Sequence, residues 1–490
     1  MTERRIGAVL MVFCPILLAA QSEEDALRIN TARHSGSARS SAMAGSFGAL
    51  GADAGAAWVN PGAMAIYSTS EFFATPGFEW NDANTSFYGT GAEALEQQVH
   101  FNNLGMVISR PTAKAESRWR SASFGLVFDR TNSHNWEITA DGAEVNSTFV
   151  QQFANEAQGT LPEALPDLFP FTSFLAFETF ALDTLGGPAN YVIWDDISSS
   201  GPTSQRHTRS SSGSNSTTSF FYSANYLDKL YIGASLGVSS SRFERRTVLS
   251  ETTLDQSVDL KDVTYEEVLT SRGSGFEMKL GAVYRFSDGI RAGLAVHSPS
   301  LYTIDEAYVT EMTTAFRAGD GYRATSPDGI FKYRLNGTWR AIGSVAAIVG
   351  KRGAINVDYE FSDPSTMRLR RSASVVDDYD FSRENQRISS VFRTNHSLRI
   401  GGEVRAGRLY VRAGWGFWGD PYDRADTRSG EDMQRYAFGV GYRTSKISVD
   451  LGISMDRWSV ANYPYDPALV APIVSDLTTT RSLISVAYRP

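Results

Sequence analysis

The chain has 490 residues, with 46 Lys and Arg against 54 Asp and Glu, and a formal net charge of -8 at pH 7. Nucleic-acid binding needs clustered basic charge, so we expect no nucleic-acid partner. Aromatic residues make up 12% of the chain and it holds 42 glycines. This mixture favours large antiparallel sheets over helices.

Residues 1–20 have the features of a secretory signal peptide. Arg4 and Arg5 form a basic start, Ile6 to Leu18 an apolar core, and Ala19-Ala20 a small-residue cleavage site. The apolar core is shorter than a membrane-spanning helix requires. The one cysteine of the chain, Cys14, lies in this segment. A chain cleaved after Ala20 would therefore carry no thiol, which excludes disulfides, thiolate metal sites and cysteine catalysis.

The stretch from Gly36 to Tyr67 is rich in Gly, Ala and Ser. Interior glycines disfavour a helix and the shortage of β-branched residues disfavours a strand. Small side chains allow backbones to approach closely, as expected of a compact segment inside a larger structure. Its strongest local signal is the turn Asn60-Pro61-Gly62. Gly45, Gly48 and Gly51 lack the strand and the acidic partner that a nucleotide loop needs.

This stretch resembles the N-terminal hatch of the FadL/TodX family of outer-membrane transporters for fatty acids and other hydrophobic compounds. The resemblance is carried by residues 37–53, by Trp58 to Met64 and by Ser70-Glu71-Phe72, and it is closest to a Bacteroidetes-type branch sometimes labelled hemin receptors. This chain has Asn60-Pro61-Gly62 where the family usually has Asn-Pro-Ala. The resemblance extends to residues 294–300, 339–344 and 358–361, and it implies that residues 21–68 form a hatch that plugs a barrel lumen.

Beyond residue 69, apolar residues alternate with polar residues or glycine. Period-two alternation puts each set on one face of a strand. The clearest apolar sets are Phe276, Met278, Leu280, Ala282 and Tyr284; Ile355, Val357, Tyr359 and Phe361; Leu398, Ile400, Gly402 and Val404; Leu409, Val411, Ala413, Trp415 and Phe417; and Ile447, Val449, Leu451 and Ile453. A soluble sandwich would turn these sets inward, whereas a membrane barrel would turn them to lipid.

The connections between the strands favour the barrel. Short turns alternate with long polar connections, as in outer-membrane barrels, and about fourteen strands can be drawn. The long connections are expected at residues 131–217, the largest, and at 245–272, 310–329, 363–395, 419–434 and 457–478. The last strand ends in Tyr488, although Arg489-Pro490 follow where an aromatic residue usually closes such barrels. The sequence therefore predicts an all-β fold, a transmembrane antiparallel β-barrel of about 14 strands over residues 69–490 with an N-terminal hatch.

On the lumen face of these strands, basic and acidic residues nearly balance. Unpaired buried charge is costly, so we expect ion pairs, some of them reaching the hatch; exposure to lumen water is the alternative for each residue. The residues expected to take part are Arg39, Asp53, Glu277, Lys279, Arg399, Glu403 and Arg412.

The largest loop has a helix-like part, an aromatic run and a Ser- and Gly-rich part over 198–219, which reads as a flexible loop. The aromatic run is either a docking groove for an apolar ligand or a loop packed on its own neighbours. The candidate ligand-binding residues are Phe169, Phe171, Phe174, Leu175 and Phe177 in this run, with Phe47 and Met64 in the hatch, while Asn60, Pro61 and Gly62 set the hatch geometry.

Catalytic signatures are missing. None of the six histidines pairs with another at metal-ligand spacing. Asp420, Asp423 and Asp426 share one loop, but not at EF-hand spacing, so we read them as solvated. We expect no enzyme activity, no metal and no cofactor.

The resulting hypothesis is a bacterial outer-membrane channel that takes up hydrophobic small molecules such as long-chain fatty acids. Its partners would be the apolar ligand, outer-membrane lipid and, during biogenesis, the barrel-assembly machinery, and we expect a monomer. Two alternatives stay open. The barrel could be a platform for a protein partner, like the shuttle component of type IX secretion, or it could take up heme.

Overall fold

The structure is a computed structural model, and it describes residues 22–33, 36–112, 116–194, 202–350, 352–372 and 379–490. The predicted signal peptide over residues 1–20 lies outside the described residues. Within the described ranges no helix has the length and apolar character that crossing a membrane requires.

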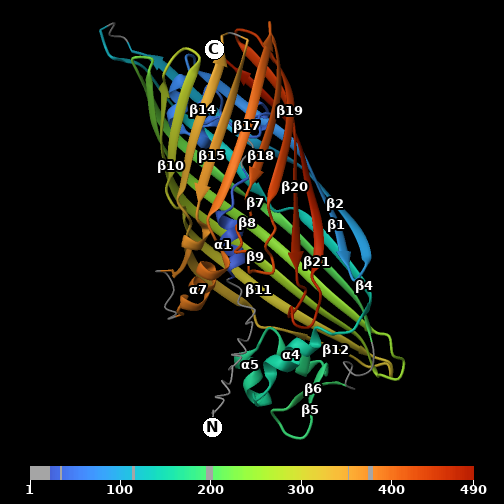
Figure 1. Cartoon of the computed structure of the whole chain (residues 1–490). Coiled ribbons are helices and arrows are strands. Elements are labelled where there is room, and N and C mark those ends of the chain that lie inside the picture. The colour runs from blue at the N-terminus through green and yellow to red at the C-terminus, as the bar shows by residue number, and fades with distance from the viewer. Residues whose placement is uncertain (1–21, 34–35, 113–115, 195–201, 351, 373–378) are drawn as a thin grey trace, which may run out of the picture.

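The described strands form one long antiparallel barrel (Figure 1). It closes because β1 pairs with β2 on one side and with β21 on the other. Counted once around the wall, the described strands form a 14-stranded barrel, as the sequence predicts. The strands are β1 (Glu71–Phe87), β2 (Thr90–Pro111), β3 (Trp119–Ser133), β4 (Trp136–Val145), β7 (Thr203–Tyr226), β8 (Leu230–Thr253), β9 (Leu260–Arg285), β10 (Ile290–His297), β11 (Leu301–Phe316), β12 (Gly321–Thr325), β13 (Gly329–Asn336), β14 (Arg340–Val349), β15 (Gly353–Ser362), β16 (Arg368–Arg371), β17 (Asn395–Ala406), β18 (Leu409–Trp418), β19 (Met433–Arg443), β20 (Ile447–Asn462) and β21 (Ile473–Tyr488).

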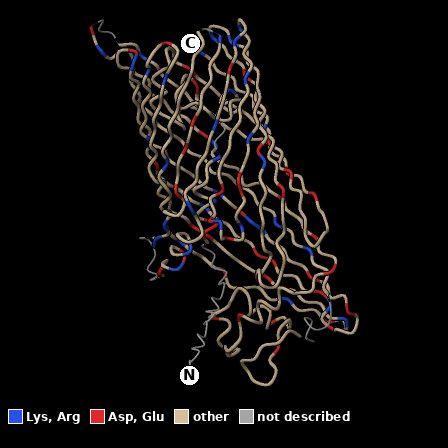
Figure 2. Tube along the Cα trace, viewed as in Figure 1, with Lys and Arg blue, Asp and Glu red and all other residues tan. Residues whose placement is uncertain are grey.

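The apolar set of each alternating strand faces outward. Leu280, Val404 and Ile453 are 52%, 65% and 55% exposed, whereas their inward-facing neighbours Lys279, Glu403 and Ser454 are buried. A soluble sandwich would bury the first group against a second sheet. The prediction that the alternating strands form a barrel with its apolar side outward is therefore confirmed. Figure 2 shows charged residues along the strands as well as at both ends of the barrel.

Several strands continue well past the apolar band of the outer wall. On β8 the outward residues are apolar from Ile232 to Val238 and polar or charged from Ser240 to Arg246. The prediction of loops over 131–217, 245–272 and 310–329 is therefore wrong in extent, because β3, β4, β7, β8, β9 and β11 occupy much of these ranges. The described part of the Ser- and Gly-rich stretch, which reads as a flexible loop, forms strand from Thr203. Outside the apolar band both faces of a strand can be polar, so the alternation that marks a strand disappears from the sequence.

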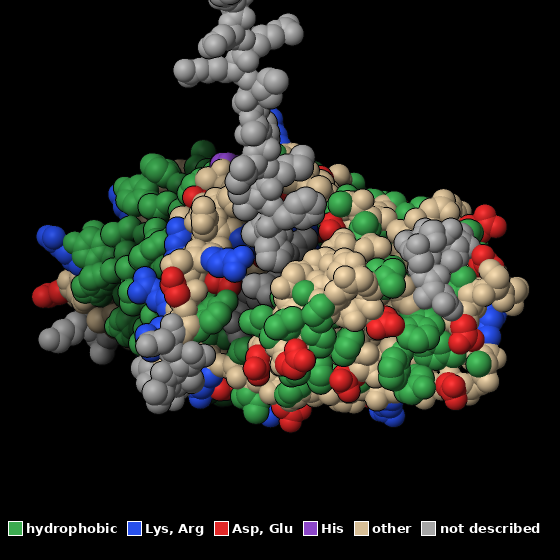
Figure 3. All heavy atoms as spheres, turned by 90° about the horizontal axis from the view of Figure 1, so that it is seen from below, with side chains coloured by type: hydrophobic (Ala, Val, Ile, Leu, Met, Phe, Trp, Pro, Cys, Tyr) green, Lys and Arg blue, Asp and Glu red, His purple; other side chains and the backbone are tan. Residues whose placement is uncertain are grey.

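The connection from β4 to β7 forms a small subdomain, which we call the cap (residues 146–194). It holds α4 (Val150–Ala157), η2 (Pro162–Ala164), α5 (Leu165–Leu168), α6 (Ser173–Glu178) and the hairpin β5 (Leu182–Thr184) and β6 (Tyr191–Ile193). Its core includes Phe149, Phe153 and Leu175 and joins Tyr265 and Met312 of the barrel. The cap lies at the end of the barrel opposite the C terminus (Figure 1). Figure 3 views the molecule from that end, where apolar and acidic side chains are interspersed.

The N-terminal residues lie within the barrel. They form α1 (Glu23–Asn30), α2 (Ala38–Ser41), α3 (Ala56–Val59) and η1 (Pro61–Ile66). Helix α1 begins with a capping box between Ser22 and Asp25. It packs on inward residues of β11 and β13 and on α7 (Ser382–Val391), next to η4 (Pro364–Thr366). We call residues 36–67 the inner segment, because nearly all of its side chains are buried by the barrel.

Candidate functional site: the inner segment and the lateral seam

Inward-facing glycines of the barrel bring the inner segment against the wall. A Cβ atom at Gly452 would overlap the carbonyl oxygen of Ala38, and one at Gly414 would overlap the backbone of Met43. Gly233 and Gly281 make room for the turn at Asn60 in the same way. Glycine has no Cβ, so it allows backbone to touch backbone at these positions. The inner segment is therefore fitted to the wall on several sides.

The turn Asn60-Pro61-Gly62 is fixed by the side chain of Asn60. Its Nδ2 donates to the carbonyl oxygen of Gly48 at 2.7 Å and to that of Ala282 at 3.1 Å. Its Oδ1 accepts from the amide of Gly62 at 3.0 Å, which caps η1. One side chain thus ties together two parts of the inner segment and strand β9.

Buried charges also hold the inner segment. Arg39 lies 2.9 Å from Glu403 and 3.9 Å from Asp53. Glu403 also pairs with Arg412 at 2.6 Å, and Arg412 pairs with Asp450 at 2.7 Å. The row links α2 to strands β17, β18 and β20, and each buried charge in it has an opposite partner.

The remaining lumen charges lie around the other side of the inner segment. Lys279 pairs with Glu277 at 2.9 Å and stands over the ring of Trp58 at 3.3 Å. Arg399 pairs with Glu360 at 3.1 Å. The carboxylate of Asp358, another lumen-facing charge, accepts from the amides of Phe47 at 2.9 Å and Gly48 at 3.2 Å.

The backbone pairing between β2 and β3 is incomplete. These strands pair only from Asn103 opposite Asp129 to Pro111 opposite Ser121. Beyond Asn103, β2 pairs with β1 alone, while β3 shifts register at Arg130 and β4 continues along β7. We call this gap the lateral seam. A recess of about 390 Å³ lies there, lined by Gln98, His100, Phe101, Phe128, Arg130, Asn135, Gly213, Ser214 and Ser216.

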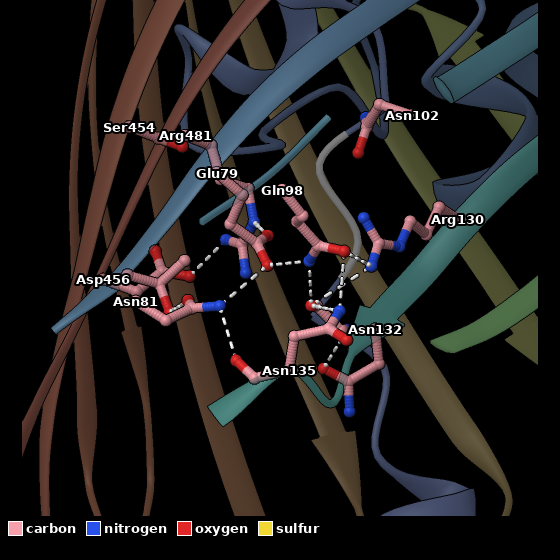
Figure 4. A network of polar contacts seen from close by, with 12 residues as sticks. Glu79, Asn81, Gln98, Asn102, Arg130, Asn132, Asn135, Ser454, Asp456 and Arg481 are labelled. Atoms are coloured by element: carbon pink, nitrogen blue, oxygen red, sulfur yellow. Dashed lines mark hydrogen bonds and ion pairs between the residues drawn. The ribbon is translucent and has the colours of Figure 1, made fainter. Parts of the chain in front are cut away.

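Side chains bridge the lateral seam in place of the missing strand pairing (Figure 4). Gln98 of β2 donates to Glu79 at 2.7 Å and accepts from Arg130 of β3 at 3.1 Å. Glu79 accepts from Arg481 at 2.6 Å, and Arg481 also pairs with Asp456 at 2.6 Å. This network runs from β20 through β21, β1 and β2 to β3. Buried polar groups need such partners where backbone pairing is absent.

Arg130 and His100 retain hydrogen-bonding capacity at the recess. The Nη1 atom of Arg130 and both ring nitrogens of His100 are buried and have no hydrogen-bond partner among the described residues. The recess thus combines exposed Phe101 and partly buried Phe128 with unused polar atoms. Sequence analysis missed these residues, because a seam depends on which strands pair at long range.

The N-terminal chain passes directly inside the lateral seam. The amide of Arg33 donates to the carbonyl oxygen of Thr131 at 2.8 Å, where β3 changes register. Asn102, the unpaired residue of a β2 bulge, donates to the carbonyl oxygen of Gly36. Backbone on either side of the inner segment's start is therefore bonded to both edges of the seam.

The predicted ligand-binding residues are packed rather than arranged around one cavity. Phe47 and Met64 are fully buried between the inner segment and the wall. Leu175 is buried in the cap, and Phe169, Phe174 and Phe177 pack against the cap core. Phe171 packs edge-on against Tyr308 of β11, with ring centroids 5.2 Å apart. The structure therefore places the aromatic run mostly inside the cap. In the described ranges, no group of three His, Cys, Asp or Glu side chains could hold a metal ion.

Comparison with solved structures identifies the fold. The chain is similar to the Pseudomonas putida toluene transporter TodX, with 12% identity, coverage of 93% of this chain and 99% of that one, and a TM-score of 0.53. It is equally similar to a Pseudomonas aeruginosa FadL homologue, with 13% identity, 93% and 98% coverage, and a TM-score of 0.54. The fold is thus that of the FadL/TodX-type outer-membrane channels. The sequence matches no protein-family model and no curated protein.

Proposed function

We propose that this protein is a channel of the bacterial outer membrane that takes up hydrophobic small molecules, and long-chain fatty acids in particular. The closed barrel with an apolar outer wall supports a membrane location, because only a closed sheet leaves no unpaired edge in lipid. The solved channels with this fold include a toluene transporter and a monoaromatic hydrocarbon channel. The inner segment would act as the hatch, with Asn60, Pro61 and Gly62 fixing its shape.

The lateral seam is the observation that supports the proposed path of the ligand out of the barrel. The bore is filled by the inner segment, whose backbone lies against wall glycines, so a straight path would require its removal. The seam would instead let a ligand leave sideways through the wall, at the level of exposed Val99 and Phe101. A ligand would pass the cap, enter the lumen and leave at the seam when Arg33 and Gly36 release its edges.

The lining of the recess favours an amphipathic ligand over a pure hydrocarbon. Phe101 and Phe128 offer apolar surface to a tail, while the unused Nη1 of Arg130 offers a charged donor to a carboxylate. A hydrocarbon would leave these buried polar atoms without partners, which is unfavourable. This is the reason for placing fatty acids first among the hydrophobic compounds.

The test is uptake of radiolabelled fatty acid by cells that make the protein, against cells that lack it. We expect Arg130→Met to lower fatty-acid uptake about tenfold, because a hydrogen bond to a charged group contributes about 1.5–3 kcal/mol. Toluene uptake should stay at the wild-type level. The matched control is Arg246→Met, which removes an exposed arginine of β8. Equal fatty-acid uptake with and without the protein would overturn the proposal.

A further inference from the structure

A second concave site lies on the outside of the barrel. It is a groove of about 740 Å³ that crosses β3, β7, β8, β9 and β10. We call it the outer groove. Its walls are apolar side chains that are 39% to 62% exposed: Trp119, Tyr222, Ile232, Leu280, Leu294 and Val296. A volume of this size is typical of sites that hold one ligand, which span about 300–1,000 Å³.

Outward-facing alanines make the floor of the outer groove. Cross-strand register places Ala122 opposite Ala224, and Ala224 opposite Ile232, which is opposite Ala282. In the next row Ala234 lies between Tyr222 and Leu280. Small residues between large ones leave a hollow on a sheet face, because side chains stand roughly perpendicular to the sheet.

Cations border the outer groove at the short-turn end of the barrel. Arg120 is exposed at the register shift of β3 between Trp119 and Ser121, and Arg118 and Lys229 are exposed near it. Acidic residues near this edge of the groove include Glu116, Asp228 and Asp288; Asp288 pairs with Arg285, and Arg120 lies 4.0 Å from Asp228. An exposed pair at that distance contributes little, so Arg120 remains available to an anion. An aromatic pair, Trp119 and Tyr226, marks the same level, with ring centroids 5.1 Å apart.

We propose that the outer groove binds one phospholipid of the surrounding membrane. Its acyl chain would lie on the alanine floor, and its phosphate would meet Arg120 with Arg118 and Lys229 nearby. The groove is continuous with the apolar outer wall, so a membrane lipid is the molecule that reaches it without crossing water. The cations match an anionic head group, whereas a second copy of the chain would bring the same positive charges together.

The outer groove backs onto the turn of the inner segment. Gly233 and Gly281 belong to its lining, and on their inward side they contact Pro61 and Asn60. The alanine floor and the backbone of β8 and β9 lie between the bound acyl chain and Asn60-Pro61-Gly62. A lipid in the groove therefore supports the wall where the turn of the inner segment lies against it.

The inference rests on the membrane location in the proposed function, but not on transport of any substrate. The experiment is native mass spectrometry of the purified full chain, released from detergent after incubation with phosphatidylglycerol. We expect one retained phosphatidylglycerol per wild-type chain. Ala234→Phe fills the floor from outside and should lower retention about tenfold, equivalent to about 1.4 kcal/mol. Arg120→Glu should lower it as well.

The matched control is Ala413→Phe, an exposed outward alanine of β18 outside the outer groove. It should retain lipid like the wild type, and the heat-dependent gel mobility of each variant reports that its barrel is folded. Equal retention in Ala234→Phe and Ala413→Phe, a wild-type chain with no lipid or with detergent alone, or a dimer that buries the groove would overturn the proposal. Because lipid retention is measured on purified protein, failure of fatty-acid uptake leaves this result unaffected.

Discussion

At the scale of residues, the inner segment can contact the wall closely because glycine has no Cβ atom. Gly281 allows the Asn60 side chain to reach the carbonyl oxygen of Ala282, and any Cβ atom there would overlap Asn60 Oδ1. Overpacking of this kind costs about 1–3 kcal/mol. The role of Gly281 becomes clear only when its contact with Asn60 of the inner segment is known.

We therefore expect Gly281→Ala to loosen the turn at residues 60–66. Hydrogen exchange followed by mass spectrometry should show faster exchange of these amides than in the wild type. Gly343→Ala is the control, because no atom lies within 4 Å of a Cβ built there. Unchanged exchange in Gly281→Ala would contradict the close packing described for the turn.

The charge of Glu403 is the second prediction at this scale. Glu403→Gln leaves Arg39 and Arg412 buried without their shared carboxylate, and breaking a buried pair costs about 3–5 kcal/mol. We expect this loss in the free energy of unfolding in denaturant. Glu266→Gln, which removes half of an exposed pair with Arg246, should change it by less than about 1 kcal/mol. Similar losses in the two variants would show that the buried row does not hold the inner segment.

At the scale of elements, the cap is attached to the barrel through a buried carboxyl group. Glu251 lies on β8 beyond the apolar band and accepts from the amide of Phe149 at 2.8 Å and from the hydroxyl of Thr148 at 2.5 Å, where the cap begins. Burial raises its pKa to about 8, although these two hydrogen bonds act in the opposite direction. The folded cap therefore holds a proton that the unfolded chain releases near pH 4.5.

This shift fixes the sign of a pH dependence. The contribution of Glu251 to cap stability is full below about pH 4.5 and is lost progressively as the pH rises to about 8. We expect limited proteolysis of the cap to be slower at pH 5 than at pH 8. Glu251→Gln, which cannot ionise, should remove most of that difference, and a difference of the same size in the variant would contradict the assignment.

The elements also show where sequence reasoning stops. Alternation predicted the membrane-level strands, such as β9 from Phe276 to Tyr284, because lipid and lumen demand opposite side chains. The part of the same strand from Leu260 to Ser274 lies largely beyond the apolar band, and its sequence does not show the alternation of apolar and polar residues. The Phe-rich run of the cap reads equally as a docking surface or as a core, and only the packing of Leu175 and Phe171 distinguishes them.

At the scale of the whole molecule, the barrel followed from the alternation, and the place of the N-terminal residues inside it followed from the family resemblance together with their small side chains. The lateral seam did not, because it requires β2 to lose its partner at Asn102 while β4 follows β7 instead. Nothing local in the sequence of β2 distinguishes a paired edge from a free one. The proposed route therefore depends on a feature that sequence alone could not supply, the break in pairing between β2 and β3.

The most direct test is fatty-acid uptake by cells that make a chain whose seam is filled. Ser216 lines the recess, and Ser240, its cross-strand partner on β8, does not. We predict that Ser216→Trp lowers uptake of radiolabelled long-chain fatty acid about tenfold, a barrier increase of about 1.4 kcal/mol. Ser240→Trp should transport at the wild-type rate. Wild-type uptake in Ser216→Trp, with folded barrels in both variants, would contradict passage through the lateral seam.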